Sequence, residues 1–134
     1  VKNFAKLNNI KIKFDLIETS EFHGYSNLLK IAIKNILKNA IQFSHNNSEI
    51  IVKSYKEKGF FNISIQDFGI GIPLNEQEKI FEKFYRTDKS RSKNSGGTGL
   101  GMSIVKKIIH IHKGYIKVES IENIGTTIFI SFKE

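Results

Sequence analysis

Apolar and polar residues alternate along several stretches of the chain, and an alternation of period two predicts β-strands. The predicted strands are residues 10–14, 19–22, 49–55, 60–66, 115–119 and 126–132. The second of these patterns is the weakest. The third and fourth flank a short turn that ends in Gly59, and the last two are also neighbours in the sequence. We therefore expect two antiparallel pairs, the first of them a hairpin.

Apolar residues at helical spacing predict two longer helices. Residues 26–43 carry such a pattern, with Ser26 as a suitable N-cap, and residues 98–112 predict the last helix. Residues 75–81 predict a short helix between them. We therefore expect an α+β fold, a two-layer sandwich with about three helices on one face of a mixed, mostly antiparallel sheet of about five strands.

A length of 134 residues is that of a single domain with its own core. The chain begins with Val1 rather than Met, so we expect a piece of a longer protein in which residues 1–9 end a linker or helix from a preceding domain. No apolar run reaches the ~18 residues of a membrane span, and the N-terminus lacks the features of a signal peptide. The absence of cysteine excludes disulfides and fits a cytoplasmic setting.

The formal net charge of +8 is compatible with a nucleic-acid or acidic-lipid partner. The lysines are spread along the sequence rather than gathered in one block, which is typical of a solvated surface. We therefore predict no nucleic-acid partner and no direct membrane contact for this domain.

Two asparagines four residues apart form the first of three clusters of candidate functional residues. Asn35 and Asn39 lie one above the other on one face of the predicted helix. Amide oxygens are neutral, hard ligands that suit a largely hydrated Mg²⁺ ion. Taken alone, the pair is more simply explained as solvent-facing polar residues.

The second cluster is Asp67 with Gly69 and Gly71. Strand parity places Asp67 on the same side as Ile63 and Ile65, so its carboxylate enters from the apolar face, where it requires a hydrogen-bond donor. An adenine amino group would supply one, and the glycines would let the backbone approach the base or adopt φ values that other residues avoid. The alternative is an aspartate that closes a turn with its own backbone.

The third cluster, Gly97-Thr98-Gly99-Leu100-Gly101, opens the last predicted helix. Backbone N–H groups at a helix start form an anion site, although the pattern is neither a P-loop nor a dinucleotide fingerprint. Residues 86–97 contain no apolar residue and predict a lid, from which Arg86 or a neighbouring cation could reach phosphate. A flexible glycine hinge is the alternative. Together, the three clusters predict a pocket for ATP and a divalent metal.

With the stretch Phe81-Glu82-Lys83-Phe84-Tyr85-Arg86, these clusters resemble the catalytic and ATP-binding domain of sensor histidine kinases. That family belongs to the ATPase superfamily shared with gyrase, mismatch-repair ATPases and a heat-shock chaperone. Residues 35–40, 67–71, 81–86 and 97–101 resemble, in this order, four sequence motifs of the family that are called the N, G1, F and G2 boxes. The resemblance covers residues 4–132.

The resemblance implies roles for individual residues. Asn39 would be the main Mg²⁺ ligand with Asn35 assisting, Asp67 would accept from the adenine N6 amino group, and Arg86 would contact the β- and γ-phosphates. The base would be walled by Phe43, Ile72 and Leu100. Thr126 would help to hold Asp67 through water. Phe81 and Phe84 would couple the lid to partner helices, or would be ordinary core aromatics.

Two positions near the end of the first predicted helix depart from the family, and residues 24–27 lack the aspartate that is frequent before this helix. Where its members often carry Lys and Tyr, this chain has Gln42 and Phe43, which removes a cation and a hydroxyl from this helix. The departure concerns phosphate contacts rather than nucleotide binding.

The resemblance also implies a reaction. Hydrolases of the superfamily carry a glutamate where this chain has Asn35, and an amide cannot act as a general base at neutral pH. We therefore expect transfer of the ATP γ-phosphoryl group to a histidine nitrogen, driven by positioning and charge neutralisation. The four histidines of the chain do not stand in the family's phosphoacceptor pattern, so we expect the acceptor in another domain.

The partners implied by the resemblance are the dimerisation and histidine-phosphotransfer domain of the same protein and the receiver domain of a response regulator. This domain would be cytoplasmic, and the intact protein would be anchored in the membrane. Two alternatives stay open. One is an anti-sigma-type protein serine kinase with the same fold, and the other is a non-catalytic module that reads ATP.

Overall fold

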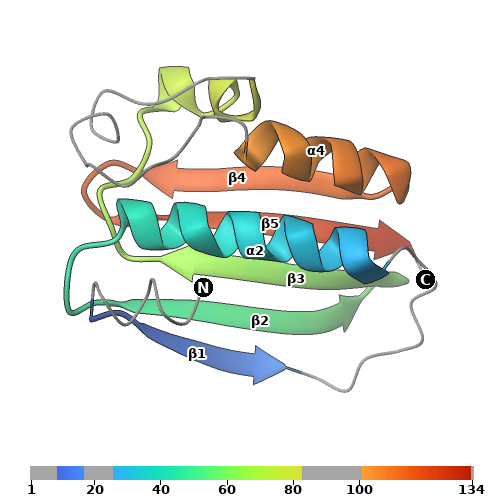
Figure 1. Cartoon of the computed structure of the whole chain (residues 1–134), viewed down its shortest axis with the longest axis horizontal. Coiled ribbons are helices and arrows are strands. Elements are labelled where there is room, and N and C mark those ends of the chain that lie inside the picture. Colours follow the sequence, from blue (N-terminus) through green and yellow to red (C-terminus); the bar gives the residue numbers. More distant parts are fainter. Residues whose placement is uncertain (1–8, 17–25, 83–100, 134) are drawn as a thin grey trace.

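The computed structural model describes residues 9–16, 26–82 and 101–133. Two α-helices of these ranges cover one face of a five-stranded sheet (Figure 1). The elements are β1 (Lys11–Leu16), α2 (Ser26–Phe43), β2 (Glu49–Glu57), β3 (Phe60–Asp67), the 3₁₀ helices η1 (Leu74–Glu76) and η2 (Lys79–Phe81), α4 (Gly101–Ile111), β4 (Tyr115–Ile121) and β5 (Gly125–Lys133). The predicted α+β two-layer sandwich is confirmed.

The strands lie in the order β1-β2-β3-β5-β4. Only β1 and β2 pair in parallel among the described strands, and the remaining neighbours are antiparallel. β2 and β3 are joined at Lys58 and Gly59, whose φ angles of 51° and 79° are those of a two-residue hairpin turn. Both predicted antiparallel pairs are confirmed. The weak strand near residues 19–22 and the linker at residues 1–8 lie outside the described residues.

The core lies between the helices and the sheet. Ile36 and Ile41 of α2 and Ile109 of α4 are almost fully buried against inward-facing strand residues such as Ile65 and Ile130. Burying an isoleucine side chain contributes roughly 1.5–3 kcal/mol, so this layer contact dominates the stability of the fold. α2 begins at Ser26 and ends at Phe43, as the apolar spacing predicted.

Two details of the prediction are wrong. The alternation of residues 10–14 predicts a half-buried strand with Ile12 and Phe14 on the same side, but Phe14 is 57% exposed, because β1 is an edge strand that the two helices do not cover (Figure 1). Residues 75–81 do not form one helix. The two 3₁₀ turns there use short-range bonds, Glu76 N–H to Pro73 O (2.9 Å) and Glu82 N–H to Lys79 O (2.9 Å), since so short a segment gains little from α-helical bonding.

Candidate functional site

Asp67 ends β3 inside the molecule, with 3% of its surface exposed. Its Oδ1 atom accepts the backbone N–H of Gly69 at 3.0 Å and that of Thr126, its partner on β5, at 3.2 Å. The predicted entry of the carboxylate from the apolar side is confirmed. The N–H of Gly69 belongs to the turn that follows Asp67. The alternative prediction, an aspartate that closes a turn with its own backbone, therefore describes part of its bonding. Two N–H donors stabilise the negative charge at this buried position.

The loop after Asp67 is packed between α2 and the β4–β5 turn. The N–H of Ile70 bonds to the carbonyl of Phe43 at the end of α2 (3.0 Å). A Cβ atom on Gly69 would lie 1.9 Å from that same carbonyl oxygen. Gly71 has a φ of 72°, and a Cβ there would lie 2.2 Å from the carbonyl oxygen of Ile121. Both glycines are therefore required by contacts within the chain itself.

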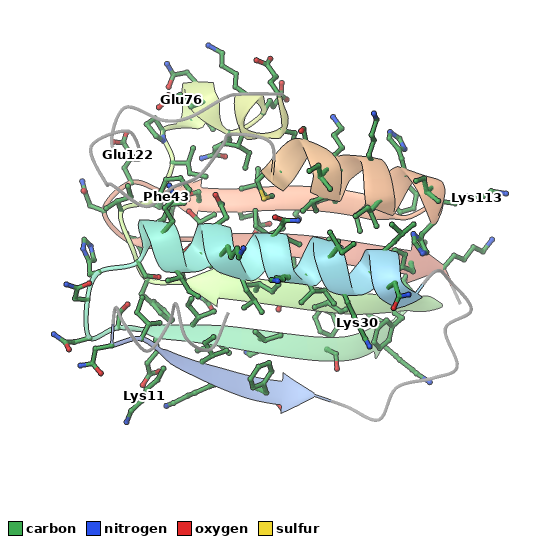
Figure 2. All side chains as sticks on the ribbon, viewed as in Figure 1. Lys11, Lys30, Phe43, Glu76, Lys113 and Glu122 are labelled. Carbon is green, nitrogen blue, oxygen red and sulfur yellow. The ribbon has the colours of Figure 1, made fainter. Side chains whose placement is uncertain are left out.

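Four further hydrogen bonds hold this loop from the β4 side. Ser120 Oγ accepts the N–H of Ile72 at 2.7 Å, and the N–H of Asn123 bonds to the carbonyl of Ile70 at 2.7 Å. Gln77 donates its side-chain amide to the carbonyls of Ile72 and Ser120, both at 3.0 Å. Figure 2 shows Phe43, Glu122 and Glu76 at this one end of the molecule.

Sequence reasoning missed Ser120 and Gln77. A signal for Ser120 was present, because alternation places it on the inward side of β4 with Ile116 and Val118, which pack against the core. A polar residue in an inward position requires a partner. Gln77 carried no comparable signal.

Asn35 lies on the flank of α2 that faces the start of α4. Asn35 is half-buried, and its Nδ2 donates to the carbonyl of Ile31 at 3.0 Å. Its Oδ1 lies 3.3 Å from the position that a Cβ on Gly101 would occupy. Asn39, one turn further along, is also half-buried. The fold thus brings Asn35 of the first cluster against Gly101, the last residue of the third cluster. Both asparagines are half-buried rather than fully exposed to solvent.

The remaining predicted residues are placed as follows. Phe43 is 5% exposed, and Ile72 has no exposed surface and belongs to the core. The hydroxyl of Thr126 lies 2.7 Å from Ser120 Oγ. Phe81 is half-buried, with the ammonium group of Lys106 5.6 Å from its ring centroid. Outside the described residues lie Phe84, Arg86, Gly97, Thr98, Gly99 and Leu100.

Within residues 9–16, 26–82 and 101–133, no group of three or more His, Cys, Asp or Glu side chains is placed to hold a metal ion. The side-chain oxygen of Asn35 adjoins Gly101 at the start of α4, and Asn39 lies one helical turn further along α2. Amide oxygens fit a Mg²⁺ ion that takes its other ligands from phosphate and water. In the same ranges, no helix combines the length and the apolar character needed to cross a bilayer.

Comparisons with known proteins agree with this geometry. Residues 24–134 match the family described as histidine kinase-, DNA gyrase B-, and HSP90-like ATPase. The chain therefore belongs to that family, and its relatives place it among the catalytic domains of sensor histidine kinases.

Two curated relatives illustrate this placement. The sensor-like histidine kinase SenX3 of Mycolicibacterium smegmatis is 41% identical over 111 residues, which cover 83% of this chain and 29% of SenX3. The sensor protein kinase WalK of Staphylococcus aureus is 44% identical over 99 residues, which cover 72% of this chain and 24% of WalK. The chain thus spans less than a third of the length of these relatives.

A solved structure shares the fold along almost the whole chain. The mycobacterial sensor histidine kinase MprB superposes with a TM-score of 0.83 at 28% sequence identity. The match covers 98% of this chain and 87% of the MprB chain.

Proposed function

We propose that this chain binds ATP with Mg²⁺ and transfers the γ-phosphoryl group to a histidine on a separate dimerisation domain, from which a response regulator is phosphorylated. The observation that carries the proposal is the setting of Asp67. A buried carboxylate ends β3 beside the loop between α2 and the β4–β5 turn, where two backbone N–H groups fix one of its oxygens. Such a rigid acceptor is suited to reading an amino group on a flat ring.

Base recognition would follow from this rigidity. A carboxylate has about four lone-pair sites, so Asp67 can accept the N6 amino group of adenine in addition to its backbone bonds. Guanine presents a carbonyl at the same place, and the carboxylate would repel it. Phe43 ends α2, its backbone carbonyl adjoins Gly69, and its side chain would border the base.

The phosphates would lie towards the asparagines and the start of α4. Asn39, assisted by Asn35, would hold the metal, which neutralises phosphate charge when bound. The backbone N–H groups at the start of α4, with Arg86 from the preceding segment, would bind the phosphates. Because Asn35 is an amide that donates to its own helix, it lacks the basicity to activate water. Transfer to a protein acceptor is favoured over hydrolysis for this reason.

The proposal is tested by calorimetric titration of the 134-residue chain with ATP, with and without Mg²⁺. We expect binding in the micromolar to sub-millimolar range that is stronger with Mg²⁺. Asp67→Asn keeps one oxygen to accept from Gly69 and Thr126 but replaces the other with a donor. We expect this variant to lose at least about tenfold in ATP affinity, which corresponds to ~1.4 kcal/mol. Asp15→Asn, at an exposed position on β1, is the matched control and should bind as the unmutated chain does.

Two results would contradict the proposal. One is a folded, unmutated chain that does not bind ATP. The other is equal loss of affinity in Asp67→Asn and Asp15→Asn, since the effect would then be one of net charge.

The reaction itself is tested by adding the dimerisation domain and labelled ATP. Acid-labile label on histidine supports the kinase, acid-stable label on serine indicates the anti-sigma-type alternative, and ATP binding without transfer indicates a module that only reads ATP.

A further inference from the structure

The hydroxyl of Ser120 is at the centre of a hydrogen-bond network that no proposed ligand role explains. It donates its single hydrogen to the carbonyl of Gly125 at 3.0 Å. It also accepts the N–H of Ile72 at 2.7 Å, and it lies 2.7 Å from the hydroxyl of Thr126. Since its hydrogen is committed to Gly125, Thr126 must be the donor in that contact. One donor and two acceptor positions are then all in use, which saturates the hydroxyl.

The partners of this hydroxyl lie on both sides of Asp67. Ile72 ends the loop that begins at Asp67 and passes through Gly69. Thr126 belongs to β5 and gives its backbone N–H to Asp67 Oδ1. Ser120 thus ties the loop on one side of the carboxylate to the strand on the other, and the side chain of Gln77 joins the carbonyls of Ile72 and Ser120 at 3.0 Å each.

We propose that Ser120 is a positioning residue for nucleotide binding, with Gln77 as its support, and that both act by fixing the Asp67 carboxylate. This inference rests on the proposed binding of adenine at Asp67. Without the Ser120 hydroxyl, the N–H of Ile72 and the hydroxyl of Thr126 lose their partner. The loop and the strand that hold Asp67 then separate by small rearrangements, and the carboxylate loses its fixed orientation while the fold persists.

The experiment compares four variants of the chain by ATP titration and by amide hydrogen exchange without nucleotide. Ser120→Ala removes the hydroxyl, Ser120→Thr retains it, and Gln77→Met removes the supporting amide at similar length. The matched control is Ser131→Ala, because the Ser131 hydroxyl bonds across strands to Asn62 Oδ1 (2.6 Å) near the other end of β5. The reporter is the Gly69 amide, which bonds to Asp67, compared with the Ile65 amide in the buried middle of β3.

We expect Ser120→Ala to weaken ATP binding by about three- to tenfold, the range for one lost hydrogen bond, and Gln77→Met to act in the same direction. Protection of the Gly69 amide should fall more than that of Ile65, because the opening is local rather than global. Ser120→Thr should restore affinity to within about twofold. Ser131→Ala should lower both amide protections together and leave ATP affinity unchanged.

The inference is overturned if Ser120→Ala and Ser131→Ala change ATP affinity equally, or if Gly69 and Ile65 lose protection in parallel. It is also overturned if both Ser120→Thr and Ser120→Ala lose affinity while Gln77→Met does not. If the unmutated chain does not bind ATP, the proposed function fails. The exchange of the Gly69 amide then still decides whether Ser120 fixes the surroundings of Asp67.

Discussion

Gly69 is the residue at which a single added carbon would disturb the candidate site most directly. A Cβ atom there would lie 1.9 Å from the carbonyl oxygen of Phe43, a backbone atom that cannot turn away as a side chain can. Overpacking of this kind costs about 1–3 kcal/mol and forces the backbone to shift. We expect Gly69→Ala to lower the free energy of unfolding in urea titrations and to abolish measurable ATP binding.

The matched control at this scale is Gly59→Ala in the β2–β3 turn. Gly59 has a φ of 79° and no atom within 4 Å of the added Cβ, so the cost is left-handed backbone strain alone, about 1–2 kcal/mol. Gly59→Ala should lower the free energy of unfolding less than Gly69→Ala does. The Gly59→Ala variant should bind ATP with the affinity of the unmutated chain. Loss of ATP binding in both glycine variants would assign the effect to general destabilisation.

At the scale of elements, α2 carries both predicted metal ligands on one flank. Asn35 and Asn39 are one turn apart, and Asn35 adjoins the first residue of α4. We expect Asn39→Ala to remove most of the gain in ATP affinity that Mg²⁺ provides, while affinity without Mg²⁺ changes little. The measurement is calorimetric titration at fixed ATP and varied Mg²⁺. Asn27→Ala, an exposed asparagine in the first turn of the same helix, should keep the full Mg²⁺ effect.

The elements also show what a sequence can predict. α2 and the four antiparallel strands were predictable because periods of 3.6 and 2.0 are local properties of long segments. The burial of Asp67 followed from the parity of β3 alone. For Ser120, the alternation of β4 indicates an inward polar side chain but not its partner Ile72, which lies 48 residues away in the sequence. For Gln77, no local pattern predicts the bond to the carbonyl of Ser120, 43 residues away. The 3₁₀ turns at residues 74–81 were missed because the segment is too short for its periodicity to decide between helix types.

At the scale of the molecule, the described acidic residues are unevenly distributed between helices and sheet, whereas lysines such as Lys13, Lys53 and Lys117 lie on strands as well as on helices. α2 and α4 together carry Lys30, Lys34, Lys38, Lys106 and Lys107, all exposed, and neither helix contains an aspartate or glutamate. The described carboxylates lie on strands, turns and 3₁₀ helices instead. The helical layer in Figure 1 is therefore a positive surface beside the flank that carries Asn35 and Asn39.

This distribution of charge predicts electrostatic steering of ATP, an anion, towards the helical layer. We expect Lys34→Glu to slow ATP association by about two- to fivefold at low ionic strength, with little change in dissociation. Lys53→Glu reverses an exposed charge on β2, outside the helical layer, and should have a smaller effect. At about 0.5 M salt, where the screening length falls to a few ångströms, the two variants should associate alike. Stopped-flow mixing with a fluorescent ATP analogue measures both rates. Equal slowing by Lys34→Glu and Lys53→Glu at low salt would show that net charge, and not the one-sided helical layer, sets the association rate.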